Sequence, residues 1–274
     1  DDAGSSGTHL NTATPAISVN TSGGADVYVT NQLNGGVTLT GNTTAGSTAI
    51  AVVSRNTGNS ANAGVTIGGG NLVNSGAGSS VSLTGSTLVL TGGITSPTIV
   101  LNFAGDLTGS GTLAAAVALQ LQGGGNVGTS GSLINIDTPS LVLGKSGGNT
   151  FLSNAGAISL EGSTGTGALQ VTAAGDITQG GAALTVGGTT TLNSGANAIT
   201  LNDTGNDFTG AVSLNNSGAN DVSITDANAL VLGASTIGRD LSVTAGGHIT
   251  QTGAITADSG GESTSAALLQ NYLE

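Results

Sequence analysis

Short apolar-x-apolar units recur along the whole chain, and this alternation constrains the fold more than any other feature. Alternating apolar residues indicate a strand with one buried face. The stretches between units are rich in Gly, Asn, Ser, Thr and Asp, which favour turns. At least eighteen such units are present, each three to five residues long. The sequence therefore predicts an all-β protein of many short strands.

Two architectures fit the spacing of these strand units. One is an antiparallel β-sandwich or barrel, and the other is a β-solenoid in which two or three short strands make one turn. The number of units exceeds that of an ordinary sandwich. The apolar residues are almost all Val, Ile and Leu, and aromatic residues make up only 2% of the chain. A sandwich of this size usually has several large aromatic residues in its core. The solenoid is therefore favoured.

One phrase occurs twice. Residues 171–185 read VTAAGDITQGGAALT, and residues 243–256 read VTAGGHITQTGAIT, so that Val171 matches Val243 and Ile177 matches Ile249 at the same offset. In a solenoid, equivalent residues of successive turns have the same packing surroundings. We therefore expect this offset to be three or four whole turns, with the phrase recurring on one face. At roughly 20 residues per turn, 274 residues would make about 13 turns.

The composition suits stacked turns made from small side chains. The chain has 49 Gly residues, 37% apolar residues and only 7% charged residues, where soluble domains have about 25% charged. Disordered chains combine low hydrophobicity with high net charge, so we expect an ordered protein. Amide side chains can form ladders between stacked turns, and Asn193, Asn202 and Asn215 are candidates at the corners.

Charge excludes two classes of partner. The net charge is −12, and Arg55, Lys145 and Arg239 are the three basic residues. Nucleic-acid binding and anionic membrane binding both require clustered Lys and Arg, so we expect neither. No run of about 18 apolar residues is present, so no membrane insertion is expected. The chain has no Cys, which rules out disulfides and thiolate metal sites.

Residues 173–201 (AAGDITQGGAALTVGGTTTLNSGANAITL) and 230–256 (LVLGASTIGRDLSVTAGGHITQTGAIT) resemble the shaft repeats of filamentous-haemagglutinin-like, two-partner-secretion exoproteins. The resemblance is clearest over residues 158–260. It implies a right-handed parallel β-helix, secretion to the bacterial cell surface or exterior, and adhesive or matrix roles. An Asn-Pro-Asn-Gly type secretion motif is not found near the N-terminus, which puts the export route in doubt.

No set of residues predicts catalysis, a cofactor or a metal centre. Asp203 and Asp207 have the oxygen ligands that calcium prefers, but the G-G-x-G-x-D repeat is missing, so we interpret them as solvated turn residues. His248 occupies the place that Asp176 has in the other copy of the phrase. This exchange indicates an exposed, tolerant position.

Five other polar residues, at three places in the sequence, are interpreted as surface features. His9 lies in a segment of small residues. Asp1 and Asp2 are adjacent carboxylates, but they stand at the start of the sequence, where we expect a frayed segment. Arg239 and Asp240 are expected to be a surface ion pair or two solvated charges, which contribute little to stability.

Two alternative functions stay open. Polysaccharide lyases and hydrolases also use β-helices, but three scattered basic residues and five aromatic residues make a poor carbohydrate cleft. Ice-binding solenoids need Thr-x-Thr at constant spacing, whereas TTTLN (189–193) and TLTG (38–41) are irregularly spaced. Fold alone does not decide function.

We therefore expect three regions: residues 1–15 as a flexible arm or cap, residues 16–260 as the solenoid, and residues 261–274 as a short helix. That helix is expected to cap the last turn or to provide an assembly contact. The predicted function is a non-enzymatic extracellular structural protein, either an adhesin shaft or a subunit of a fibre, biofilm or matrix. End-to-end self-association and a glycan or protein at a cell surface are the expected partners.

Overall fold

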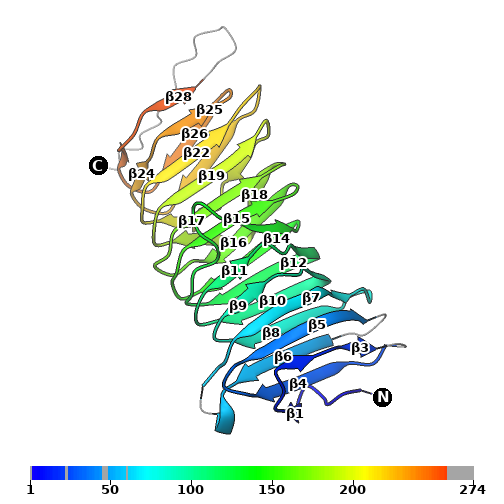
Figure 1. Cartoon of the computed structure of the whole chain (residues 1–274). Coiled ribbons are helices and arrows are strands. Elements are labelled where there is room, and N and C mark those ends of the chain that lie inside the picture. Colours follow the sequence, from blue (N-terminus) through cyan, green and yellow to red (C-terminus); the bar gives the residue numbers. More distant parts are fainter. Residues whose placement is uncertain (1, 22–23, 45–48, 60, 258–274) are drawn as a thin grey trace. The chain divides into compact units, whose positions relative to one another are not determined.

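The computed structural model describes residues 2–21, 24–44, 49–59 and 61–257. These residues form parallel β-strands almost throughout (Figure 1). The chain divides into two compact units, Asp1–Thr138 and Pro139–Glu274. In each unit the strands of one turn pair with those of the turns before and after it, which makes a β-solenoid. The described residues make about 12 turns in total, and the predicted all-β parallel β-helix is confirmed.

The first unit has short strands separated by turns, and its one helical element among the described residues is the 3-10 turn η1 (Thr57–Asn59). Its strands are β1 (Leu10–Thr12), β2 (Ala16–Ile17), β3 (Asn20–Thr21), β4 (Val27–Gln32), β5 (Val37–Thr44), β6 (Ala49–Arg55), β7 (Val65–Asn74), β8 (Ser80–Gly85), β9 (Leu88–Leu90), β10 (Ile94–Phe103), β11 (Leu107–Gly109), β12 (Leu113–Gly123) and β13 (Ile134–Asp137).

The second unit is built in the same way, and no helix occurs in its described part, residues 139–257. Its strands are β14 (Ser140–Lys145), β15 (Thr150–Asn154), β16 (Ile158–Ser163), β17 (Leu169–Ala173), β18 (Ile177–Val186), β19 (Thr190–Gly195), β20 (Ile199–Leu201), β21 (Asp207–Phe208), β22 (Val212–Asn216), β23 (Val222–Asp226), β24 (Leu230–Leu232), β25 (Ser235–Ile237), β26 (Leu241–Ala245), β27 (Ile249–Gln251) and β28 (Ile255–Ala257).

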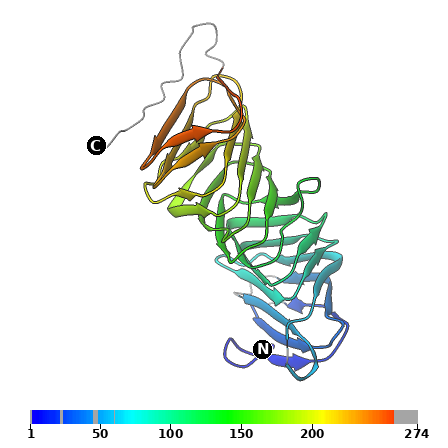
Figure 2. The same cartoon turned by 90° about the vertical axis from the view of Figure 1, so that its left-hand side faces the viewer.

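Aliphatic side chains stack in columns inside each unit, because the inward residues of paired strands are in register; Figure 2 shows the strands of successive turns lying over one another. Burying one such side chain between its neighbours stabilises the fold by about 1.5–3 kcal/mol. The first unit has the column Val29, Val52, Leu83, Leu101 and Leu121, whose members are at most 3% exposed. The second unit has the column Ile158, Ile177, Ile199, Val222 and Leu241.

The length of a turn is not constant. Val52, Leu83 and Leu101 are consecutive members of one column, yet the step in sequence from the first to the second is much longer than the step from the second to the third. In the second unit, the steps from Leu152 to Val171 and from Val171 to Leu192 are nearly equal. Extra residues lie between strands or at register shifts, as between β16 and β18, where Leu160 pairs with Gln179 but Gly162 pairs with Leu184. Sequence spacing therefore does not identify which residues are stacked.

The repeated phrase does not recur on one face, so that prediction was wrong. Val171 lies on β17, which is in the column of strands β15, β19 and β22. Val243 lies on β26, which stacks on β23 and, below it, β20 and β18. The offset between the two copies is therefore not a whole number of turns. The phrase encodes a strand, a corner and a strand, and it is used at two different corners.

The structure describes residues 2–21 at the start of the sequence but not residues 258–274 at its end. Residues 1–15, expected to be an arm or cap, contain β1, which pairs in parallel with β4. Sequence patterning missed this strand because Leu10 is its only large apolar residue. The helix expected over residues 261–274 lies outside the described residues.

Candidate functional site

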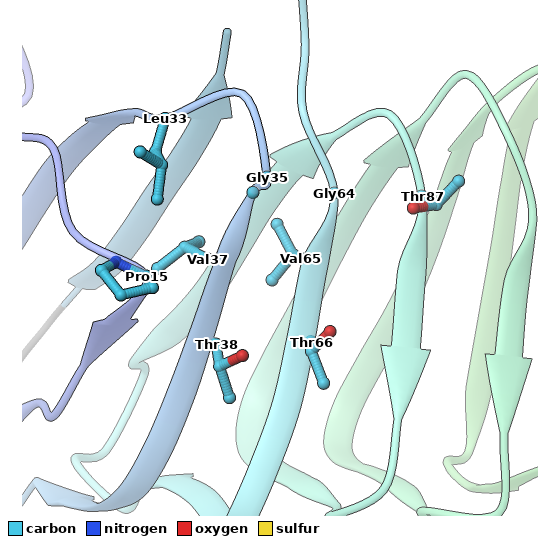
Figure 3. Close-up of a pocket in the computed structure, with 10 residues that line it drawn as sticks. Pro15, Leu33, Gly35, Val37, Thr38, Gly64, Val65, Thr66 and Thr87 are labelled. Atoms are coloured by element: carbon cyan, nitrogen blue, oxygen red, sulfur yellow. The ribbon is translucent and has the colours of Figure 1, made fainter. Parts of the chain in front are cut away.

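A hollow of about 320 Å³ opens on the first unit (Figure 3). It lies where successive turns come close together, near Gly36 and Gly64. Gly36 has a φ of 80°, and a Cβ there would overlap the carbonyl of Gly64, so the two backbones approach without side chains between them. The residues that line the hollow are Pro15, Leu33, Gly35, Gly36, Val37, Thr38, Gly64, Val65, Thr66 and Thr87.

The residues that line this hollow are uncharged. Thr38 and Thr66 are direct partners on β5 and β7, so their hydroxyls repeat at the spacing of neighbouring strands, about 4.8 Å. Pro15 and Leu33 provide apolar contacts (Figure 3). None of the ten lining residues is titratable. The hollow can therefore contact an uncharged group through hydroxyls and apolar atoms, but its lining supplies no carboxylate, imidazole or amine.

One outward column of the second unit carries only hydroxyl side chains over six turns. Some of these hydroxyls donate to the preceding turn: Ser159 Oγ lies 3.1 Å from the carbonyl oxygen of Pro139. The column is therefore partly used to join neighbouring turns, and the rest of it presents a neutral, polar surface. Its members are Ser140, Ser159, Thr178, Thr200, Ser223 and Ser242.

A second outward column contains an amide ladder. Asn193 and Asn215 are register partners on β19 and β22, and Asn215 Nδ2 donates to Asn193 Oδ1 at 3.0 Å. Asn193 Nδ2 in turn donates to Thr172 Oγ1 at 3.3 Å. The predicted ladder is confirmed for these two residues, although they lie on strands and not at corners. Asn202 is exposed beyond the end of β20 and has no hydrogen-bond partner within the described part of the chain, so the prediction was wrong for it.

The two candidate calcium ligands serve separate local structures. Asp203 Oδ1 accepts a hydrogen bond from the backbone N–H of Gly205 at 2.8 Å, which is the contact of an Asx turn. Asp207 Oδ1 accepts a hydrogen bond from Asn228 Nδ2 in the next turn at 3.1 Å. The described residues contain no group of three or more His, Cys, Asp or Glu side chains that is arranged to hold a metal ion.

Asp176 belongs to a recurrent corner contact that sequence reasoning missed. Its Oδ1 accepts a hydrogen bond from the backbone N–H of Ala198, one turn further on, at 2.9 Å. Asp26 and Asp106 accept equivalent bonds from Ala49 and Asn126, both at 2.9 Å. These carboxylates, each directly before a strand, join turns at the corners. The signal was the recurrence of Asp directly before an apolar-x-apolar unit.

The two histidines make local contacts. His248 is exposed, as expected, and its carbonyl accepts a hydrogen bond from the N–H of Leu230 at 3.0 Å. His9 lies against Tyr28, with ring centroids 5.8 Å apart, and its Nδ1 is 3.1 Å from Thr30 Oγ1. The side chain of His9 thus contacts a phenol ring and a hydroxyl.

Asp2 also forms a corner contact. Its Oδ1 accepts a hydrogen bond from the backbone N–H of Asp26 at 2.9 Å. Asp1 lies outside the described residues. Asp2, which was expected to be frayed, is instead held to the following turn by this contact.

Asn206 organises a buried polar corner that alternation did not reveal. Its side chain is fully buried. Its Oδ1 accepts a hydrogen bond from the N–H of Leu184 at 2.8 Å. Its Nδ2 donates to Gln179 Oε1 at 3.0 Å and to the carbonyl of Leu201 at 3.3 Å. One amide thus satisfies groups from two turns, which matters because unpaired buried polar groups are costly.

Arg239 pairs chiefly with Asp221 of the preceding turn, and its contact with Asp240 is longer. Its guanidinium donates two hydrogen bonds to the Asp221 carboxylate, whereas Asp240 Oδ2 is 3.9 Å from Nε. The hydrogen bond from Arg239 lowers the pKa of Asp221 below its ordinary value of 3.8. The guanidinium therefore contacts two carboxylates, one on its own turn and one on the turn before.

We expect R239Q to lower the unfolding midpoint slightly at neutral pH and low salt, because both partners are exposed and screened by solvent. Because the pKa of Asp221 is lowered in the folded state, its ion pair with Arg239 stabilises the fold above pH 3.8. This stabilisation is lost as the pH falls through the pKa that Asp221 has in the folded state. The difference between wild type and R239Q should therefore disappear in strong acid and in high salt. Thermal unfolding followed by circular dichroism at several pH values measures it. A difference that persists at acidic pH would contradict this assignment.

A family model matches part of the second unit. Residues 147–215 and 219–268 match the model described as "Repeats of unknown function (DUF5649)". The chain is a β-solenoid repeat protein. The starts of the two matched stretches have the same offset as the two copies of the repeated phrase. The comparisons found no matching curated protein and no matching solved structure. Among the described residues, no helix has the length and hydropathy needed to cross a bilayer.

Proposed function

We propose that this chain is a non-enzymatic structural segment of an extracellular protein, serving as the shaft of a bacterial surface adhesin or as a subunit of an extracellular fibre or matrix. One observation carries the proposal. Within each unit, every turn is joined to the next by parallel main-chain pairing, and the outward positions on these strands carry mainly Ser, Thr and Asn. Such a stack supplies stiffness through backbone hydrogen bonds and needs no reacting group.

The placement of charge supports the same role. Lys145 is buried at 5% exposure, and Arg239 is held by Asp221 and Asp240. With Arg55, these are the three basic residues of the chain, so proteases that cleave after basic residues have few sites on it. Resistance to proteolysis favours a protein that persists outside the cell. The resemblance of residues 158–260 to exoprotein shaft repeats points to the same location.

The hollow on the first unit is consistent with a passive contact. Its hydroxyl and apolar lining fits an uncharged surface group better than a charged substrate, since no charged side chain is among the residues that line it. A cell-surface glycan or protein is therefore proposed as a contact of the shaft. End-to-end association of copies of the chain is proposed as the route to a fibre.

Localisation and assembly are tested with the protein in its native cells and after purification. Antibodies against the chain should label intact cells or their surrounding matrix without permeabilisation. Electron microscopy of the purified protein over a range of concentrations distinguishes a stalk, which stays as separate particles, from a fibre subunit, which forms threads of constant width. Labelling confined to permeabilised cells would refute the extracellular role. Turnover of a polysaccharide by the purified chain would refute the non-enzymatic one.

A further inference from the structure

Asp226 is a carboxyl buried inside the second unit. It ends β23, in which Val222, Ile224 and Asp226 are the inward residues, and it is only 2% exposed. An aliphatic side chain would be expected at this place in the alternation. Burial of an ionised carboxylate is strongly unfavourable unless it is paired and hydrogen-bonded, so the partners of both oxygens decide what this residue does.

The two carboxyl oxygens of Asp226 differ. Oδ1 accepts a hydrogen bond from the backbone N–H of Phe208, in the turn below, at 3.0 Å. Oδ2 is buried and has no hydrogen-bond partner within the described part of the chain. Phe208 is itself fully buried. One oxygen of the carboxyl thus joins β21 to β23, while the other lies in surroundings that favour an uncharged group.

No cation among the neighbouring described elements compensates the charge. In β20 the strand residues are Ile199–Leu201, all uncharged. In the turn above, Ala245 of β26 is the register partner of Asp226. In the turn below, β21 contributes Asp207, a second acid. Arg239 is bound to Asp221, which precedes β23 at the opposite end of the strand.

The electrostatic consequence follows from these neighbours. Burial raises the pKa of Asp226 above 3.8, and the charge of Asp207 raises it further. The hydrogen bond from Phe208 and the nearby backbone N–H groups of Ala227 and Asn228 oppose the shift without reversing it. The folded chain therefore holds this proton at pH values where the unfolded chain has released it.

We propose that Asp226 makes the second unit pH-sensitive, because its uncharged carboxyl packs stably between β21 and β26 and its ionisation loosens these turns. The sign is fixed by proton linkage. Above pH 3.8 Asp226 binds up to one more proton in the folded state than in the unfolded state. Its contribution to stability therefore falls as the pH rises through the pKa that Asp226 has in the folded state. Asp226 thus contributes more to the stability of the second unit in mild acid than at neutral pH.

The test compares the pH dependence of unfolding of wild type and D226N in the full chain. One extra bound proton makes the unfolding constant rise by up to about tenfold per pH unit. D226N keeps an oxygen acceptor for Phe208 but cannot ionise, so it should remove this component and be more stable than wild type at neutral pH. D203N is the matched control, since Asp203 is an acid of the same corner region whose contact is the local Asx turn. It should keep the wild-type pH profile.

Two further measurements keep the proposal testable if D226N folds poorly. D207N should weaken the pH dependence without altering the buried position, because it removes the neighbouring negative charge. Carbon-13 NMR of the wild-type side-chain carboxyls reports the titration of Asp226 directly. As the pH rises through the pKa of Asp226, hydrogen exchange at the amide of Phe208 should accelerate by more than the ordinary increase of amide exchange rates with pH. A wild-type pH profile in D226N, or an Asp226 carboxyl that titrates at or below 3.8, would overturn the proposal.

Discussion

G125A is expected to destabilise the first unit by about 3 kcal/mol, at the upper end of typical overpacking costs. Gly125 lies in the connection between β12 and β13, directly over Gly105 of the preceding turn. A Cβ added to Gly125 would overlap the carbonyl carbon and oxygen of Gly105. These are backbone atoms fixed by the stacking of the turns, so they cannot rotate aside as a side chain would. Relief requires the two turns to separate, which breaks main-chain pairing nearby.

The same connection provides a control for this prediction. A Cβ added to Gly131 has no heavy atom within 4 Å, so G131A should change the free energy of unfolding by no more than about 0.5 kcal/mol. Urea unfolding followed by far-ultraviolet circular dichroism measures both variants. Hydrogen exchange should show lost protection in β11 and β13 for G125A alone. Equal stability of the two variants would mean that the corners at Gly105 and Gly125 are not in close contact.

N206A is expected to destabilise the second unit by about 2–3 kcal/mol, within the range for buried polar groups left without partners. The substitution removes the acceptor for the N–H of Leu184 and the donor to the carbonyl of Leu201. It also frees Gln179 Oε1 from its bond with Asn206 Nδ2. Because Asn206 is fully buried, water does not replace these bonds without opening the corner.

Asn202 provides the matched control for N206A. It is exposed in the same connection between β20 and β21, and N202A should be close to wild type, within about 0.5 kcal/mol. Chemical unfolding gives the free energies, and hydrogen exchange at the amide of Leu184 reports the local effect. Exchange at Leu184 should accelerate in N206A and stay unchanged in N202A. Identical behaviour of the two variants would contradict the bridging role assigned to Asn206.

Some of the residues singled out from the sequence make the contacts expected of them, and others do not. The position of each residue within its turn explains the difference. Asn193 and Asn215 were correctly expected to form a ladder, because stacked strands place equivalent outward residues together. Asp203 and Asp207 were close in sequence but serve different contacts. Asn206 and Asp226 were missed. A polar residue that faces inward at the end of a strand has the same sequence appearance as an ordinary turn residue.

The sequence by itself determined the strands and their inward faces, because alternation of Val, Ile and Leu with small polar residues allows only one side of each strand to be buried. It also determined that the chain would be a stack of short strands. Only the tertiary structure decided which residues are stacked, as Val171 and Val243 show by lying in different columns. The physical reason is that corners and register shifts absorb insertions at little cost while the strand segments on either side stay paired. Turn length therefore varies along the chain, and the neighbour of a residue in the next turn depends on the whole winding of the chain.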